Sequence, residues 1–391
     1  MSRNSAHDRL SIAFLCDHSP LNEQLYSGGN HRIYKALQTH VGDVDILSNS
    51  WGLAEPIRKL MHKLPDRINL RLRWRLHVML APLIARQVRR ELAKGKYDVL
   101  FSTYSFQSLY RVKPPYPMTV VHTSDATPTV YRNSEIGASF GSYFSASRMI
   151  DPIITRTEKA TFQAADLLLW PSDWLRDAAN STYDLDAATS LTVPWGANIA
   201  APEHSDTPTR IVPGETLHLL FVGRDWYAKG GHITIETLKH LRDAGIDAHL
   251  TVIGTTPPPE VDTTHVTIHP SLNKSVPDEL AEFTSLYRRS HFVVMPSMES
   301  YGFAFCEASA YGVPSLCFRA GGVPIRDGIN GFALPLGSDG QAFADTIQPY
   351  LQNPTAYDAL RASTQQEYEE RLNWDAWGKT VAELLRSKAA Q

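Results

Sequence analysis

The chain has 391 residues, of which 43% are hydrophobic and 20% charged, and its formal net charge is −3. This is the composition of a globular protein, the length predicts two domains, and the small negative charge argues against a nucleic-acid partner. Three cysteines are too few for a disulfide framework or a closed zinc site.

The start of the chain does not resemble a targeting segment. Residues 1–9 are polar, and the apolar run 10–16 is too short for the core of a signal peptide. The most apolar stretch elsewhere, residues 76–85, contains His77 and Pro82 and is shorter than the roughly 20 residues that span a bilayer. Since the cysteines also indicate a reducing compartment, we expect a cytoplasmic protein.

Short apolar runs alternate with longer amphipathic runs along the chain, which is typical of β-α units around a parallel sheet. In the first half the predicted strands are 11–16, 44–47, 97–102, 118–122, 167–170 and 190–193. In the second half they are 217–222, 248–253, 266–269, 292–295, 315–318 and 331–334. Between the halves, residues 200–216 are rich in proline and have no periodicity, which indicates a linker. We therefore predict two doubly wound α/β domains, residues 1–200 and 201–373, with ligands bound in a cleft between them.

Residues 58–96 concentrate the basic charge of the first half. They hold twelve lysines and arginines against only Asp66 and Glu91, and leucines and Trp74 are interleaved with Arg71, Arg73 and Arg75. Basic side chains beside apolar ones suit an anionic membrane surface, and they equally suit a phosphorylated or acidic binding partner. The third interpretation is a solvated basic face on a helix whose leucines pack inside. The sequence leaves all three open.

A glycine-rich turn follows the predicted strand 217–222. It reads Gly223-Arg-Asp-Trp-Tyr-Ala-Lys-Gly-Gly231 and precedes an amphipathic helix. Backbone amides and the helix dipole favour an anion there, and Arg224 and Lys229 add positive charge. The alternative is a surface turn with two solvated cations. Neither the P-loop motif nor GxGxxG is present, which argues against a nucleoside triphosphatase and a dehydrogenase.

Two glutamates follow the predicted strand 292–295. Glu299 lies in the next loop, and Glu307 lies early in a predicted helix, 303–311. Both are expected at the carboxyl end of the strand, facing the cleft, where carboxylates can accept hydrogen bonds from the hydroxyls of a ribose or a sugar. The alternative is a helix N-terminus stabilised by acidic residues.

Taken in order, these motifs resemble the retaining GT-B glycosyltransferases of family four, the glycosyltransferase group 1 type. The resemblance rests on Arg224 and Lys229, the Glu-x7-Glu pair Glu299 and Glu307, Gly312-Val-Pro314 and Gly321-Gly322. It extends to Gly28-Gly29-Asn30, Trp170-Pro-Ser172, Pro194-Trp-Gly196-Ala-Asn198 and Asp327-Gly-Ile-Asn-Gly331. It implies the GT-B fold, in which two Rossmann-like domains face a central cleft. An acceptor-side first domain, a donor-binding second domain and a last helix, 374–391, that returns to the first domain are then expected.

The resemblance also implies a reaction. A sugar would move from a nucleoside diphosphate sugar to an acceptor hydroxyl with retained configuration and without a metal, in the synthesis of a glycan, glycolipid or other glycoconjugate. Residues 273–275, placed to meet the base, do not discriminate among UDP-, GDP- and ADP-linked donors, and the acceptor is a glycan, a lipid or a small molecule. The alternatives are a nucleotide-sugar epimerase of the same fold and a non-catalytic protein that binds a nucleotide or a membrane. A membrane-bound protein would be peripheral at the inner face.

Individual roles follow only from the resemblance. Arg224 and Lys229 would hold the diphosphate, Glu307 the ribose, and Glu299 would lie beside the transferred sugar. His122 would contact that sugar; its alternative is a polar strand-end residue satisfied by the backbone. Arg326 stands in the turn where the family often has glutamate, and no donor role is expected of it. The implied catalytic residues are His122, Glu299, Arg224 and Lys229, and the implied donor-binding residues are Gly28, Gly29, Gly223, Arg224, Lys229, Glu299, Tyr301, Gly302, Phe303 and Glu307.

Overall fold

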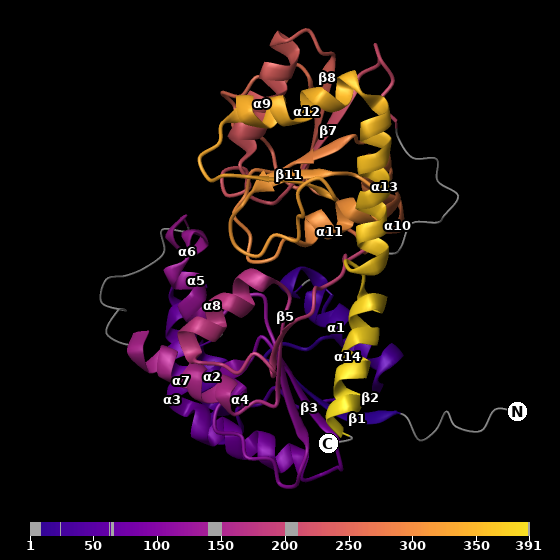
Figure 1. Ribbon diagram of the computed structural model, residues 1–391. Helices are drawn as coiled ribbons and strands as arrows, with labels where there is room; N and C mark the ends of the chain where they lie inside the picture. Colours follow the sequence, from indigo (N-terminus) through magenta and orange to yellow (C-terminus); the bar gives the residue numbers. More distant parts are fainter. Residues whose placement is uncertain are drawn as a thin grey trace, which may run out of the picture. The chain divides into compact units, whose positions relative to one another are not determined.

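A computed structural model describes residues 9–23, 25–61, 63, 66–139, 151–199 and 210–389 (Figure 1). The chain divides into two compact units, one formed by residues 1–195 with 374–391 and the other by residues 196–373. The first segment of the first unit ends at Trp195, whereas the sequence predicted the boundary after residue 200. Most of the predicted linker, residues 200–209, lies outside the described residues.

The first unit is built on a parallel sheet of six strands in the order β2-β1-β3-β4-β5-β6. The strands are β1 (Leu10–Leu15), β2 (Gly42–Ile46), β3 (Val99–Thr103), β4 (Thr119–Thr123), β5 (Leu167–Trp170) and β6 (Ser190–Thr192). All six predicted strands are confirmed, with ends shifted by at most two residues. The strands β3 and β5 are buried along their whole length, because helices cover both faces of the sheet.

Helices connect these strands and cover them. They are α1 (Gly29–His40), α2 (Glu55–Met61), α3 (Asp66–Leu92), α4 (Phe106–Leu109), α5 (Pro128–Asn133), α6 (Glu135–Ser139), α7 (Asp151–Gln163), α8 (Asp173–Tyr183) and α14 (Trp374–Ala389), with 3-10 turns η1 (Leu25–Gly28) and η2 (Gly52–Ala54). The last of them, α14, packs against α1, as Figure 1 shows. His40 Nε2 lies 2.9 Å from Asp375 Oδ1, and the buried ring of Trp377 meets the edge of Phe101.

The second unit repeats the scheme with strand order β12-β11-β10-β7-β8-β9, again all parallel. Its strands are β7 (Leu217–Val222), β8 (Ala248–Ile253), β9 (Val266–His269), β10 (Phe292–Val294), β11 (Ser315–Phe318) and β12 (Gly331–Leu334). Its helices are α9 (Gly231–Asp243), α10 (Pro277–Arg288), α11 (Phe303–Ala310), α12 (Gly340–Gln352) and α13 (Pro354–Glu370). These strands confirm the remaining six predictions.

The strand order determines which loops meet. In the second unit the direction of winding reverses between β7 and β10, which are hydrogen-bonded neighbours with Leu219 opposite Phe292. Such a reversal opens a crevice at the carboxyl ends of the two strands. The loops that leave β7 and β10 are the ones that carry Arg224 and Glu299. In the first unit the reversal lies between β1 and β3, next to the loop that leads to Gly28.

Candidate active site

The turn after β7 is closed by its own backbone and by two glycines. Asp225 Oδ1 accepts from the amide of Ala228 at 2.8 Å, and the amide of Gly231 donates to the carbonyl of Trp226 at 2.8 Å. Gly230 has φ +76°, and a Cβ there would lie 2.1 Å from the carbonyl oxygen of Pro296 in the loop after β10. A Cβ on Gly231 would enter the buried ring of Trp226. Glycine is therefore required at both positions for α9 to begin against the neighbouring loop.

The two cations of this turn have different surroundings. Lys229 Nζ forms an ion pair with Glu299 Oε1, which also accepts from Ser297 Oγ at 3.0 Å. The structure thus joins two residues that lie 70 positions apart in the chain. Arg224 is exposed, and within the described part of the chain it has no ion pair or side-chain hydrogen bond. Its positive charge is uncompensated at the edge where β7 ends.

Glu307 is more enclosed than the sequence indicated. The helix α11 begins after Gly302, whose φ is +91°, and this places the Glu307 side chain inside the unit at 3% exposure. Lys274 Nζ donates to Glu307 Oε1 at 2.5 Å and also lies 4.4 Å from the ring centroid of Phe283. A lysine from the loop after β9 thus covers the Glu307 carboxylate, and its contact with a ribose stays a prediction. Burial, with the charge of Glu307 nearby, raises the pKa of Tyr287 well above its usual value.

The loop around Glu299 is joined to the loop after β11. Glu299 and Gly321 form an isolated β-bridge, and the amide of Gly322 donates to the carbonyl of Glu299 at 3.1 Å. The next predicted donor residue, Tyr301, has a buried ring that meets Phe303 edge to face. The Tyr301 ring belongs to the core, so a ligand would meet this residue through its backbone.

The glycine loop of the first unit has a strained backbone. Tyr26 and Ser27 have φ of 53° and 54°, and Gly28 follows with φ 87° as the N-cap of α1. Three consecutive residues are thus left-handed, and Gly29 follows as the buried first residue of the helix. Asn30 fixes the loop, since its Nδ2 donates to the carbonyl of His18 and its Oδ1 accepts from Thr103 Oγ1. Residues in such conformations are held by their surroundings and gather at functional sites.

His122 lies in the core of the first unit. Its ring is 1% exposed on β4, packs against Phe162 and Trp170, and has Nδ1 3.2 Å from Ser102 Oγ. Burial lowers the pKa of His122 to about 3, so the imidazole is neutral. The contact with Ser102 fits the structural interpretation, and a contact of His122 with the donor sugar stays a prediction. His122 belongs to the first unit, whereas Lys229, Glu299, Lys274 and Glu307 belong to the second.

The buried imidazole gives a testable dependence of stability on pH. Below its ordinary pKa of 6.5, His122 takes up a proton in the unfolded chain and not in the folded one, so acid favours unfolding. We expect this group to remove about 1.4 kcal/mol from the free energy of unfolding per pH unit between about 6.5 and 3. The free energy of unfolding, measured by urea titration at pH 7.5 and 5.5, should therefore fall less between these pH values in His122→Gln than in the wild type. His291, whose pKa is lowered to about 4 by burial, remains in both proteins and cancels in the difference. The same dependence of unfolding free energy on pH in both proteins, together with loss of sugar transfer in the variant, would indicate that His122 contacts the ligand.

Neither a metal-binding cluster nor a membrane-spanning helix is found among the described residues. Among them, no three or more histidine, cysteine, aspartate or glutamate side chains are grouped so as to hold a metal ion. No helix in the described ranges combines the length and the apolar character needed to span a bilayer.

Comparisons with known proteins agree with this architecture. A family model described as glycosyl transferases group 1 matches residues 216–353, a range that includes Arg224, Lys229, Lys274, Glu299 and Glu307. A D-inositol 3-phosphate glycosyltransferase of Pseudarthrobacter chlorophenolicus is 26% identical over 339 residues, which cover 80% of this chain and 74% of that protein. One of Corynebacterium glutamicum is 26% identical over 317 residues, with coverages of 76% and 72%.

Solved structures share the fold across nearly the whole chain. Sucrose-phosphate synthase from Thermosynechococcus elongatus superimposes with a TM-score of 0.64 at 18% identity, covering 98% of this chain and 100% of that one. WaaG, a glycosyltransferase involved in lipopolysaccharide biosynthesis, gives a TM-score of 0.59 at 13% identity, with coverages of 96% and 99%.

Proposed function

We propose a reaction for this chain from the premise that it is a glycosyltransferase of group 1 with the GT-B fold, an enzyme of glycoconjugate biosynthesis. Such an enzyme takes a nucleotide-sugar donor and an acceptor. The reaction is transfer of the sugar to an acceptor hydroxyl with retained anomeric configuration. The observation that supports it is the contact of the turn after β7 with the loop after β10, through the Lys229–Glu299 ion pair and the close approach of Gly230 to Pro296, with Glu307 on the helix that follows that loop. The comparisons do not favour the epimerase alternative.

The donor diphosphate would bind at the turn after β7. Arg224 brings an exposed guanidinium without a partner among the described residues, and the N-terminus of α9 follows it. Lys229 would exchange its contact with Glu299 for a phosphate oxygen when the donor binds. Both cations then lie where negative charge develops as the nucleoside diphosphate leaves. Electrostatic stabilisation of that charge is the main catalytic contribution that these residues can make.

The ribose would bind at Glu307. Its carboxylate has a proton donor in Lys274 before the donor arrives, and two neighbouring ribose hydroxyls can replace that ammonium group. Glu299 would lie beside the sugar, with Tyr301, Gly302 and Phe303 contributing backbone at the start of α11. Glu299 keeps the hydrogen bond from Ser297 Oγ, and we do not assign it as the nucleophile of a double displacement. We therefore propose attack on the face from which the diphosphate leaves, with a phosphate oxygen accepting the proton of the acceptor hydroxyl.

The chemistry of this site supports turnover without a divalent metal, because two cationic side chains supply the charge that Mg²⁺ or Mn²⁺ would otherwise provide. Transfer should therefore proceed at an unchanged rate after incubation with EDTA. The rate is measured as release of the nucleoside diphosphate with and without added Mg²⁺ or Mn²⁺. Activity that EDTA abolishes and either metal restores would contradict the proposal.

The names of the relatives suggest which class of acceptor to assay first. Several of them, at 26% identity, are named for D-inositol 3-phosphate, so a phosphorylated cyclitol is the acceptor class to assay first. The assay offers D-inositol 3-phosphate and unphosphorylated myo-inositol in parallel with UDP-, GDP- and ADP-linked sugars. Transfer to the phosphorylated compound alone would support this class. Turnover only with a lipid or glycan acceptor would exclude it.

A surface of the first unit supports a peripheral position at an anionic membrane, at the cytoplasmic face. Leu53, Ile57 and Leu60 have helical spacing on η2 and α2, and Leu53 and Leu60 are 72% and 65% exposed beside the exposed Lys59. On α3, Met79 is 74% exposed, and exposed arginines follow it toward the end of the helix. Apolar side chains rimmed by cations match the interfacial region of an anionic bilayer. The side chains of Arg71, Arg73 and Arg75 lie outside what the structure describes.

This position predicts salt-sensitive binding to vesicles. The wild-type protein should sediment with vesicles that contain anionic lipid at low salt, and less so as the salt concentration rises. A Leu53→Ser, Leu60→Ser double variant and an Arg71→Ser, Arg73→Ser, Arg75→Ser triple variant should both bind more weakly. Leu336→Ser, which alters an exposed leucine of the second unit, is the matched control. Absence of wild-type protein from the pellet would contradict membrane binding and support the interpretation of residues 58–96 as a solvated basic face.

A further inference from the structure

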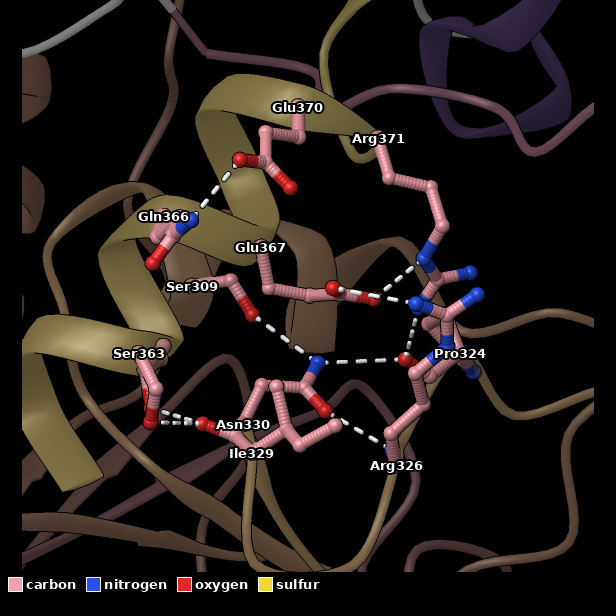
Figure 2. A network of polar contacts seen from close by, with 11 residues as sticks. Ser309, Pro324, Arg326, Ile329, Asn330, Ser363, Gln366, Glu367, Glu370 and Arg371 are labelled. Carbon is pink, nitrogen blue, oxygen red and sulfur yellow. Dashed lines mark hydrogen bonds and ion pairs between the residues drawn. The ribbon is translucent and has the colours of Figure 1, made fainter.

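A buried carboxylate on α13 links the loop after β11 to the end of the second unit. Glu367 is 5% exposed and accepts from two guanidinium groups, that of Arg371 directly after the helix and that of Arg326 in the loop, the latter at 3.3 Å (Figure 2). Arg371 Nη2 then reaches the loop directly and donates to the carbonyl of Pro324 at 2.9 Å. Glu367 thus holds the loop through one arginine and orients a second arginine that also holds it.

Asn330 completes this network from the other end of the loop. Its buried side chain accepts from the amide of Arg326 at 2.7 Å and donates to the carbonyl of Pro324 at 3.1 Å and to Ser309 Oγ at 3.3 Å. Ser309 lies on α11, two positions after Glu307. Figure 2 shows these side chains converging on the turn between Pro324 and Asn330. The turn is therefore fixed to both α11 and α13.

The opposite end of the same loop lies at the candidate site. Near the start of the loop 319–330, Gly321 and Gly322 hold the backbone of Glu299 by a β-bridge and a hydrogen bond of 3.1 Å. Only one residue, Val323, separates Gly322 from Pro324. Any freedom of the turn at Pro324 is consequently passed on to the backbone that supports Glu299.

We propose that Glu367 is a positioning residue for sugar transfer. Through Arg326 and Arg371 it fixes the loop 319–330, and through that loop it fixes Glu299 beside the sugar of the donor. This inference rests on the proposed function, which places Glu299 at the sugar and Arg224 and Glu307 at the nucleotide. Glu367 itself touches no substrate. Its loss is expected to weaken recognition of the sugar and to leave recognition of the nucleoside diphosphate intact.

The test compares Glu367→Gln with Glu370→Gln in the full chain. Both change one carboxylate of α13 to an amide, but Glu370 is exposed and has only Gln366 as its partner in this part of the helix. Hydrogen exchange is measured on peptides that cover 319–331, and binding of a nucleoside diphosphate and of its sugar derivative is measured by calorimetry. In Glu367→Gln we expect faster exchange in this loop and about tenfold weaker binding of the sugar nucleotide, as for the loss of a charged hydrogen bond. Nucleoside diphosphate binding should change less than about twofold, and Glu370→Gln should match the wild type.

A second variant tests the proposal in case Glu367→Gln does not fold. Arg326→Gln changes a half-exposed side chain and leaves Glu367 paired with Arg371, so the unit should fold. It should show the same effects to a smaller extent, because Arg371 still joins Glu367 to Pro324. The double variant should add little to Glu367→Gln, which already breaks the contact with Arg326. Unchanged exchange in the loop, or equal weakening of both ligands together with a lower melting temperature, would overturn the proposal. If the wild-type chain binds no nucleotide, the proposed function fails, while the exchange measurement still decides whether Glu367 fixes the loop.

Discussion

Arg224→Ala is expected to lower kcat by about 10²–10³-fold, and Lys229→Ala by a similar factor, because each removes a cation from the leaving diphosphate. Arg224 is exposed and makes no ion pair with the described residues, so its removal should leave the free energy of unfolding almost unchanged. A fall in kcat without a fall in stability would therefore report on the reaction itself. The measurement is steady-state release of the nucleoside diphosphate, alongside thermal unfolding of each variant.

Lys229→Ala differs from Arg224→Ala in one respect. It leaves Glu299 without its ion-pair partner, so some loss of stability is expected with the loss of activity. Arg289→Ala, which removes a surface ion pair of α10, is the matched control and should retain wild-type kcat. Rates close to wild type in both Arg224→Ala and Lys229→Ala would place the diphosphate elsewhere.

Glu307→Gln should weaken binding of the nucleoside diphosphate by about 10–100-fold, because an amide cannot accept from both ribose hydroxyls as a carboxylate does. Isothermal calorimetry with the nucleoside diphosphate alone measures this effect without the sugar or the acceptor. Glu282→Gln, a change of the same kind at a half-exposed position on α10, should bind normally.

A double variant distinguishes loss of the ribose contact from loss of stability caused by breaking the buried pair of Glu307 and Lys274. Glu307→Gln alone leaves Lys274 without its partner, whereas Lys274→Met with Glu307→Gln removes both charges of the pair. The double variant should recover stability and still bind the nucleotide weakly. Recovery of affinity together with stability would show that Glu307 supports the fold and does not contact the ribose.

The fold could be predicted from the sequence because parallel strands that are buried on both faces consist of consecutive apolar residues. The stretches 217–222 and 315–318 are of this kind, and all twelve predicted strands are present. The placement of the turn after β7 beside the loop of Glu299 also followed, since both come at the carboxyl ends of strands. The two helices α2 and α3 were not separated in advance, because residues 58–96 give charge and alternation without a clear helix boundary.

The partners of the site residues could not be predicted. Lys274 covers Glu307 and Glu367 holds Arg326 across separations of 33 and 41 residues, which no local pattern encodes. The burial of His122 depends on Phe162 and Trp170, which come from other elements of the first unit. Likewise, the need for glycine at Gly230 becomes visible only when Pro296 lies against it. Residue type indicated the chemistry, and the packing of distant segments determined which groups are paired.

The central claim, that the turn after β7 and the glutamates after β10 bind a nucleoside diphosphate sugar, is tested most directly by thermal unfolding with UDP, GDP, ADP and their sugars. A ligand at 100 times its Kd stabilises the folded state by about 2.7 kcal/mol, which a melting curve resolves easily. We expect one nucleotide and its sugar derivative to raise the melting temperature of the wild type, and expect smaller shifts in Arg224→Ala and Glu307→Gln. No shift with any of the six compounds at millimolar concentration, or the same shift in both variants as in the wild type, would contradict the account.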